Sequence, residues 1–425
     1  MKYNLDAQEN MDKIPYDSQP IYRQTQNKKR KPEKSTSHPK FLSLVVCLLV
    51  VLNVVLCGLV IDLAKKNDAP NQTNIIQITT NGSLNVSAVA DKTKSSVVAI
   101  HAGNLTNVDA SSFYRLSSRG AGIIIDGNKS TGECYILTCY HVVKSYANGI
   151  YVLLYDSFTP VKATLVTTTG YSKMYDIAVL KFTNAEYKKS SSKPCEIGSS
   201  ASVRDGDAVI AYGNPQGTGL SVTSGEISKT INIVNVDGIY NRLLKTSAPI
   251  NGGNSGGGLF SAEGKLIGIV NAKTNDDPTS GSYIDNIAYA IPIDVAYSLA
   301  KNIIRNDRPL KAVTGLSFGV QNINVKYEDE NGLPIPATQT ILVKEVLNDS
   351  SASIAGFEVG DEIVSFSYGE GDEIVMRNLY SLEDHIFNFS MGDIVMFKVV
   401  RGSREITLSL KIKSLVAADS KDWYK

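Results

Sequence analysis

Short runs of β-forming residues, separated by turn residues, are the feature that most constrains the fold of this chain. They lie at Ser96–Ile100, Ala121–Ile125, Cys134–Thr138, Ile150–Leu154, Ile177–Lys181, Ala208–Tyr212, Lys265–Val270 and Ile287–Ile291. Many short strands with little helix between them are typical of an all-β barrel or sandwich. The first good helical period is Ile293–Ile304. We therefore predict a mostly-β domain over residues 91–308 that closes with this helix.

A second, smaller module is predicted after a hinge at residues 309–312. Its strand-like stretches are Leu316–Val325, Thr340–Val346, Glu362–Tyr368, Ile394–Val400 and Ile406–Ile412. Two helical segments are expected among them, Ser351–Ala355, stopped by Gly356, and Ser381–Phe389. These elements predict a compact β-rich module over residues 313–415, followed by a frayed polar tail at 416–425.

The stretch Asn251–Gly258 sets one serine, Ser255, among five glycines. Glycine is unfavourable inside helices and strands and is found where the backbone needs unusual dihedrals or a close approach. A serine on such a tight turn presents its hydroxyl beside converging backbone N–H groups, as acyl transfer requires. A flexible glycine-rich loop is the alternative, and for G-x-S-x-G alone it is the better interpretation.

A nucleophilic serine needs a base, and histidine is the usual one because its pKa lies near neutral pH. The chain has four histidines. His38 falls in the N-terminal tail, His385 in the second module, and His101 at a strand end that we expect on the surface. His141 follows a strand and precedes Val142-Val143, so it is the best candidate. A buried structural histidine is the alternative for this residue taken alone.

Asp176 is the best candidate for the acid that orients the base. It interrupts an apolar strand, where a charge needs a partner, although ordinary strand-end capping is an alternative. The chain order His141, Asp176, Ser255 is that of the chymotrypsin-type double barrel, whereas an α/β-hydrolase runs Ser, Asp, His. The lipase or esterase hypothesis therefore fails on residue order and on the absence of βαβ alternation.

On its motifs the sequence resembles the HtrA (high-temperature-requirement, Do-like) family of serine proteases over most of residues 90–415. The matching segments are Leu137–Val143, Tyr175–Lys181, Ala211–Gly217, Ser221–Ser228, Gly253–Gly257 and Ala288–Ile293. The resemblance implies a trypsin-like double β-barrel with His141 as general base, Asp176 as its partner and Ser255 as nucleophile. It also implies an oxyanion hole from the N–H groups of Gly253 and Ser255.

The active-site loop departs from the family pattern at Gly252 and Gly258, where proline is usual, and at Ser247, where an aspartate is common. More glycine predicts a looser loop, which substrate or a partner would have to order. The second hypothesis is therefore a proteolytically weak or inactive scaffold or chaperone that binds unfolded polypeptides. The complete set of His141, Asp176 and Ser255 counts against it.

The second module resembles a PDZ domain. Ser317-Phe318-Gly319-Val320 aligns with the loop whose N–H groups bind a peptide C-terminus in that family. The resemblance to the HtrA family further implies ATP-independent cleavage of misfolded or damaged exported proteins, a homotrimer, and a preference for small aliphatic residues at the cleavage site.

The N-terminal part predicts a membrane anchor. Residues 41–61 carry no charge and are nearly all apolar, which is enough to span a bilayer as a helix. Basic residues crowd the preceding segment, so the N-terminus is expected in the cytoplasm and the catalytic domain outside. Residues 1–40 are predicted to be a disordered tail and residues 62–90 an extracytoplasmic linker.

Charge and cysteine content exclude other classes. A formal net charge of +1 argues against a nucleic-acid partner. Cys134, Cys139 and Cys195 outside the anchor make neither a disulfide framework nor a zinc spacing. We expect no metal and no cofactor. The expected partners are unfolded polypeptides, peptide C-termini and the membrane.

Overall fold

The computed structural model describes residues 85–105, 107–236, 239–271, 288–324 and 338–420. Contacts divide the chain into two compact units, and all described residues belong to the second, Asn74–Lys425. The predicted tail at 1–40, the predicted anchor at 41–61 and the linker up to residue 84 lie outside the described residues. Within the described ranges, no helix is long and apolar enough to cross a bilayer.

The described chain begins with helix α2, Val86–Thr93, so the prediction of an extended linker up to residue 90 is wrong at its end. Asn85 caps this helix, because its side chain accepts the backbone N–H of Ala88 at 3.1 Å. Val89 and Thr93 fall on one face, four residues apart, and are buried. The Asn- and Ser-rich composition masked this cap and its short apolar face.

Six strands close the first barrel, in the order β3-β2-β1-β4-β5-β7, with β7 pairing back to β3. They are β1 Val97–Ala102, β2 Ser118–Asn128, β3 Glu133–Cys139, β4 Ile150–Leu153, β5 Val161–Leu165 and β7 Ile177–Thr183, with the two-residue β6 Tyr171–Ser172 beside β7. Short helices α3 Ala110–Phe113, α4 Tyr140–Val143 and α5 Ala185–Lys189, and the 3-10 turn η1 Lys94–Ser96, fill the connections.

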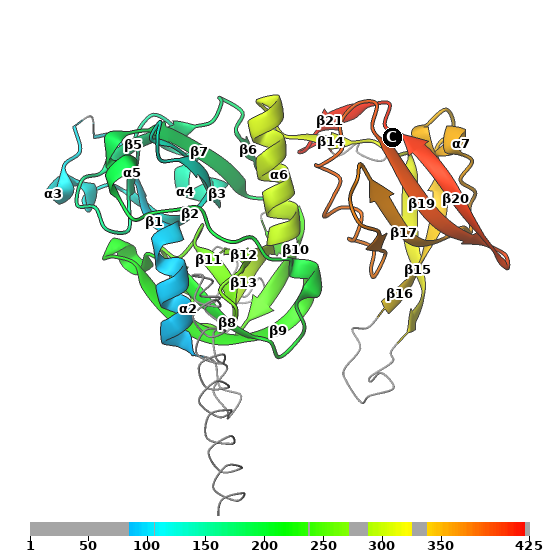
Figure 1. The fold of residues 1–425 in the computed structure, drawn as a ribbon, viewed down its shortest axis with the longest axis horizontal. Helices are drawn as coiled ribbons and strands as arrows, with labels where there is room; N and C mark the ends of the chain where they lie inside the picture. The colour runs from blue at the N-terminus through cyan, green and yellow to red at the C-terminus, as the bar shows by residue number, and fades with distance from the viewer. Residues whose placement is uncertain (1–84, 106, 237–238, 272–287, 325–337, 421–425) are drawn as a thin grey trace, which may run out of the picture. The chain divides into compact units, whose positions relative to one another are not determined.

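The second barrel is closed in the order β10-β13-β12-β11-β8-β9. Its members are β8 Ala208–Gly213, β9 Ser221–Val236, β10 Ile239–Thr246, β11 Gly258–Ser261, β12 Leu266–Val270 and β13 Ala288–Pro292, with the 3-10 turns η2 Ser200–Ser202 and η3 Pro215–Gly217 before and after β8. All these pairings are antiparallel. The predicted double β-barrel is therefore confirmed, and Figure 1 shows both barrels in the blue-to-green part of the chain.

Helix α6, Ile293–Asn306, follows the second barrel as predicted. Its apolar face buries Val295, Leu299 and Ile303. Asp307 ends the helix in a left-handed conformation with φ 60°. Because the apolar residues recur every three or four positions, the helix binds the barrel core through one stripe.

Residues 309–312 are not the hinge that we predicted. Strand β14, Leu310–Ala312, pairs with β21, Leu415–Ala417, whose last two residues lie in the predicted frayed tail. Ala418 is fully buried and donates its N–H to the carbonyl of Pro309 at 3.0 Å. The polar sequence after residue 417 hid this pairing, because a short strand is stabilised here by its partner rather than by an apolar pattern. Residues 421–425 lie outside the described part.

The C-terminal sheet has the order β15-β16-β17-β19-β20, with β18 paired to β17. Its strands are β15 Leu316–Asn324, β16 Thr338–Val346, β17 Glu362–Tyr368, β18 Ile374–Val375, β19 Ile394–Arg401 and β20 Arg404–Lys411. Helix α7, Ser351–Ala355, ends at the left-handed Gly356 as predicted. The helix predicted at 381–389 is wrong, because these residues form successive turns. The side chains of Leu382, Ile386, Phe387 and Phe389 are buried from this irregular segment.

Candidate active site

His141 lies in α4, directly after β3, and is held by Asp176. Its backbone N–H donates to Oδ1 of Asp176 at 2.9 Å, and its Nδ1 lies 2.6 Å from Oδ2. The two side chains are 19% and 18% exposed, so the pair is largely buried but still reaches solvent. A carboxylate that binds both the backbone and the ring of the same histidine fixes the ring orientation and leaves Nε2 for another partner.

Asp176 occupies a strained position at the start of β7. Its φ is 50°, in the left-handed region that aspartate tolerates better than most residues. Its carbonyl accepts the N–H of Tyr140 at 3.0 Å, and its Oδ2 also accepts a hydrogen bond from Nδ2 of Asn271 at 3.1 Å. Two side chains and the backbone N–H of His141 therefore fix the carboxylate, which explains why a charge is tolerated at the mouth of an apolar strand.

Ser255 lies in the glycine-rich turn that precedes β11, and only 5% of its surface is exposed. Its carbonyl accepts the N–H of Ala121 at 2.9 Å, while the N–H of Gly256 donates to Val270 at 2.9 Å. A Cβ on Gly256, which has φ 82°, would lie 2.2 Å from Oγ1 of Thr138. The turn therefore packs against the end of β3, close in sequence to His141, and only glycine permits this approach.

The peptide group between Gly252 and Gly253 has a defined orientation. The carbonyl of Gly252 accepts the N–H of Gln216 at 2.8 Å. The described chain has no cis peptide bonds, and in a trans peptide the N–H and C=O point in opposite directions. The N–H of Gly253 therefore points away from Gln216. Gly253 itself needs φ 99°, and a Cβ there would lie 2.3 Å from the carbonyl oxygen of Asn214.

His101 is fully buried, so its predicted surface position is wrong. Its Nδ1 lies 2.8 Å from the carbonyl of Phe113, and its Nε2 lies 3.0 Å from Nδ2 of Asn214. Burial lowers the pKa of His101. The backbone N–H of Asn214 in turn donates to the carbonyl of Gly253 at 3.3 Å. His101 is therefore linked through Asn214 to the glycine-rich turn. The sequence carried no signal for this contact beyond the histidine itself.

Cys139, His141 and Asp176 place a thiol, an imidazole and a carboxylate within 4.8 Å of one another. Burial raises the pKa of the Cys139 thiol well above its usual value. The thiol therefore stays protonated, and it lies 3.4 Å from the carbonyl of Val270. A zinc ligand would have to be a thiolate, so these three residues fit an acid–base pair with a packing cysteine better than a metal site.

The similarity of this chain to known proteins agrees with this geometry. The family description "Trypsin-like peptidase domain" matches residues 120–269. The serine endoprotease DegS of Escherichia coli strain K12 is 31% identical over 314 residues, which cover 74% of this chain and 81% of DegS. This chain belongs to the HtrA family of serine proteases.

Other relatives agree with that assignment. The serine protease Do-like HtrA of Bacillus subtilis is 31% identical over 70% of this chain, and the match spans 64% of the relative's length. The HtrA-type protease AlgW, solved with a tripeptide, is 25% identical with a TM-score of 0.51 and covers 78% of this chain and 97% of AlgW. The trypsin-like fold and the serine endopeptidase class of this HtrA protein follow from these matches.

A cavity of about 760 Å³ opens beside the His141–Asp176 pair of this HtrA protease. Besides that pair, Lys311, Ser317 and Glu383 contribute to its wall. Lys311 is 2% exposed, and burial lowers its pKa to about 8, partly offset by the negative charges of Glu383 and Asp419. The cavity therefore combines the acid–base pair with groups from the C-terminal part of the chain.

The residues predicted as a carboxylate-binding loop in this HtrA protease lie in a strand. Ser317-Phe318-Gly319-Val320 belong to β15 and pair with β16, with a register shift between Ser317 and Phe318. A register shift of this kind bends a strand and redirects its N–H groups. Ser317 and Phe318 line the cavity described above, whereas Gly319 and Val320 do not.

Proposed function

We propose that this protein is an HtrA-type serine endopeptidase that works through His141, Asp176 and Ser255. The two hydrogen bonds between His141 and Asp176 carry the proposal. One joins the backbone N–H of His141 to Oδ1 at 2.9 Å, and the other joins the ring Nδ1 to Oδ2 at 2.6 Å. Both residues come from the first barrel, and Ser255 comes from the loop before β11 of the second. The close packing of Gly256 on Thr138 supports the juxtaposition of the two barrels at this point.

In the proposed reaction, Oγ of Ser255 attacks the carbonyl carbon of a peptide bond, and Nε2 of His141 takes the hydroxyl proton. Asp176 holds Nδ1–H and stabilises the imidazolium that forms. The N–H groups of Gly253 and Ser255 would bind the oxyanion, and His141 then gives its proton to the leaving amine. The orientation of the Gly252–Gly253 peptide supports the role of Gly253, because its N–H points away from Gln216.

The substrates that we propose are misfolded or damaged exported proteins, cleaved without ATP. We place the catalytic domain outside the cell membrane on one N-terminal anchor, residues 41–61, and assign residues 313–415 to a PDZ domain that binds peptide C-termini through Ser317, Phe318, Gly319 and Val320. A homotrimer is proposed by analogy with the family. The tripeptide bound to AlgW supports peptide recognition by a protein of this fold.

The test compares residues 64–425 with the same chain carrying Ser255→Ala, each incubated with unfolded casein. Loss of the nucleophile removes several orders of magnitude of rate. We expect cleavage by the unaltered chain alone. A fluorophosphonate probe that reacts only with an activated serine should label the unaltered chain and not the variant.

Other outcomes have distinct meanings. Equal cleavage by both proteins would show that Ser255 is not the nucleophile. Failure of both proteins to cleave, even with peptides offered to the C-terminal module, would contradict the proposed peptidase and favour a scaffold or chaperone. A His141→Gln variant should match Ser255→Ala, because the two groups act as one unit.

A further inference from the structure

The turn between β6 and β7 carries Asp176, and its backbone N–H groups bind a carboxylate far away in the sequence. The N–H groups of Lys173 and Met174 donate to Oδ2 and Oδ1 of Asp419 at 3.0 and 3.2 Å. The hydroxyl of the fully buried Ser172 donates to Oδ1 of the same carboxylate. Asp419 thus satisfies three donors of a turn that the sheets leave unpaired.

Asp419 is itself held in place by the last strand of the described chain. Strand β21 pairs with β14, and Leu310 lies opposite Ala417, Lys311 opposite Val416 and Ala312 opposite Leu415. One residue before Asp419, Ala418 is buried and bonded to Pro309, and one residue after it, the carbonyl of Ser420 accepts from Nζ of Lys311 at 3.0 Å. The carboxylate therefore reaches the turn from a fixed backbone.

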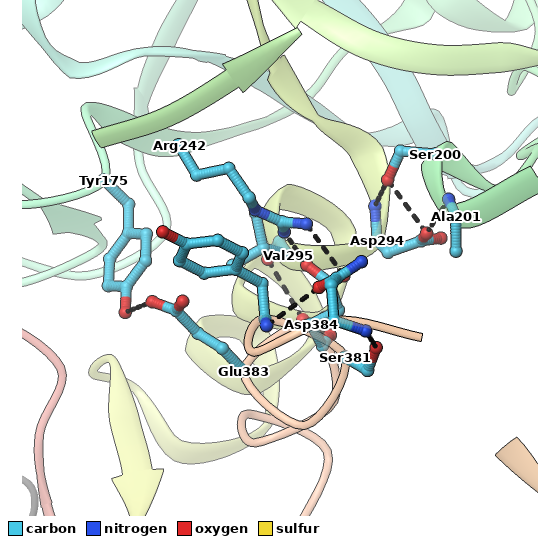
Figure 2. A network of polar contacts seen from close by, with 12 residues as sticks. Tyr175, Ser200, Ala201, Arg242, Asp294, Val295, Ser381, Glu383 and Asp384 are labelled. Atoms are coloured by element: carbon cyan, nitrogen blue, oxygen red, sulfur yellow. Dashed lines mark hydrogen bonds and ion pairs between the residues drawn. The ribbon is translucent and has the colours of Figure 1, made fainter. Parts of the chain in front are cut away.

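A second contact holds the same turn from another segment near the C-terminus. The hydroxyl of Tyr175 donates to Oε1 of Glu383 at 2.9 Å, and its ring meets the ring of Phe387 edge-on at 5.3 Å between centroids. Figure 2 shows Tyr175 and Glu383 joined in this way. Lys173 is thus bonded to Asp419, and Tyr175 to Glu383, so both neighbours of Met174 are held by residues of the C-terminal part.

We propose that Asp419 is a positioning residue for the catalytic Asp176, so that proteolysis depends on the segment that directly follows β21. This inference rests on the proposed function, because it requires Asp176 to orient His141. The three hydrogen bonds of Asp419 described above go to Ser172, Lys173 and Met174, which lie before Asp176 in the chain. Asp419 acts on the backbone of Lys173 and Met174, which leads directly into Asp176.

The strain at Asp176 gives this contact its effect. A left-handed φ of 50° costs free energy in a residue with a side chain, and the neighbouring backbone must hold it. The turn's own closing bond, from the N–H of Asp176 to the carbonyl of Lys173, is long at 3.4 Å. Without Asp419 the turn relaxes, and a displacement of the carboxylate by about 1 Å can cost about 100-fold in rate.

The experiment uses the chain from residue 64 to 425 with Asp419→Ala, Asp419→Glu and Asp372→Asn. Asp372 is an exposed acid of the C-terminal module with none of these contacts, and it is the matched control. We expect Asp419→Ala to lower kcat roughly 10- to 100-fold with little change in KM. Asp419→Glu, which keeps the charge and the acceptor oxygens, should recover part of the rate, and Asp372→Asn should match the unaltered chain.

A readout that does not require proteolysis separates this inference from the proposed function. The proton between Nδ1 of His141 and Asp176 gives a downfield NMR resonance when the pair is well formed. We expect Asp419→Ala to broaden or shift that resonance and to displace the acidic limb of the kcat/KM pH profile. Tyr175→Phe, which loses only the bond to Glu383, should do the same to a smaller degree.

Several results would overturn the inference. One is a kcat within about twofold of the unaltered chain for Asp419→Ala. Another is a fall in the rate of Asp419→Ala that matches the fraction of unfolded protein, while the NMR resonance and the pH profile stay unchanged. If Ser255→Ala remained active, the proposed function would fail instead, whatever the Asp419 variants did. If Ser255→Ala is inactive and Asp419→Ala is fully active, the inference alone is wrong.

Discussion

Asn271 donates a hydrogen bond from Nδ2 to Oδ2 of Asp176 at 3.1 Å, the same oxygen that faces Nδ1 of His141 at 2.6 Å. The amide comes from the end of β12 in the second barrel, while the carboxylate belongs to the first. Asn271 is buried, with 4% of its surface exposed. The amide therefore helps to fix the carboxylate across the junction between the barrels.

Removing this amide should weaken catalysis. A hydrogen bond to a charged group contributes about 1.5–3 kcal/mol, so we expect Asn271→Ala to lower kcat/KM by roughly 10- to 100-fold. Asn271→Asp should be worse at neutral pH, because two carboxylates this close cannot both ionise easily. Pre-steady-state and steady-state rates over a pH series measure both. A rate for Asn271→Ala equal to that of the unaltered chain would show that the amide is not needed.

The two glycines before Asn254 should respond differently to alanine. A Cβ on Gly253 would lie 2.3 Å from the carbonyl oxygen of Asn214, on a backbone with φ 99°, whereas a Cβ on Gly252 meets nothing within 4 Å. We expect Gly253→Ala to lower kcat about 10²–10³-fold, comparable to losing one oxyanion donor, and Gly252→Ala to have a far smaller effect. Similar losses in both variants would contradict the orientation described for this peptide group.

Lys311 should make stability depend on alkaline pH. Burial lowers its pKa to about 8 in the folded protein, from an ordinary value of 10.5, so between these values the unfolded chain binds more protons. Stability from this group therefore rises with pH across that window. We expect Lys311→Met to be more stable than the unaltered chain at pH 7.5, to keep only part of that advantage at pH 9.5 and to lose the rest above pH 10.5. Urea unfolding at both pH values gives the difference in free energy of unfolding between the two proteins. The contributions of the other titrating groups cancel in this difference.

Arg242 and Asp384 form a buried ion pair between β10 and the irregular segment after β18 (Figure 2). Nη1 of Arg242 lies 3.2 Å from Oδ2 of Asp384, and Nη2 contacts Oδ1. Burial raises the pKa of Asp384 to about 7, although the Arg242 charge opposes this shift. Removing Arg242 alone leaves a buried carboxyl unpaired, so Arg242→Met should cost about 3–5 kcal/mol in the free energy of unfolding.

The double variant Arg242→Met/Asp384→Leu separates the pair's net contribution from the cost of stranding one partner. We expect it to be more stable than Arg242→Met alone, because two apolar groups replace two desolvated charges. Denaturant unfolding of the four proteins of the cycle gives the coupling. Additive effects of the two substitutions would show that the groups do not interact.

Local patterns in the sequence predicted an all-β barrel or sandwich and singled out His141 and Asp176, whereas the double barrel itself was predicted from the order of these residues with Ser255 and from the resemblance to the HtrA family. Strand alternation and turn residues define the barrels, and a charge inside an apolar run signals a partner. The supports of the site escaped prediction for the opposite reason. His101 meets Asn214, and Asp419 meets Lys173, across long stretches of chain. No local pattern marks the partner of a single polar residue.

The same reasoning explains the errors at the ends of the elements. The apolar residues of segment 381–389 have the spacing of an amphipathic helix, but the segment forms a series of turns. These turns still bury the apolar side chains, so tertiary packing takes the place of helical hydrogen bonds. Strand β21 is only three residues long and exists through its pairing with β14. In both cases packing overrides the local preference on which sequence-based prediction depends.

The surroundings of the buried Cys134 and Cys139 and of the half-buried Cys195 have a chemical consequence for a protein proposed to work outside the cell. Cys134, Cys139 and Cys195 are unpaired, and burial raises the pKa of each thiol, to about 12 for Cys195. The thiolate is the form that attacks disulfides and oxidants. Each sulfur is thus kept in its inert form by the folded state itself. These three thiols can therefore face an oxidising milieu without crosslinking while the protein is folded, and they become reactive only in molecules that have unfolded.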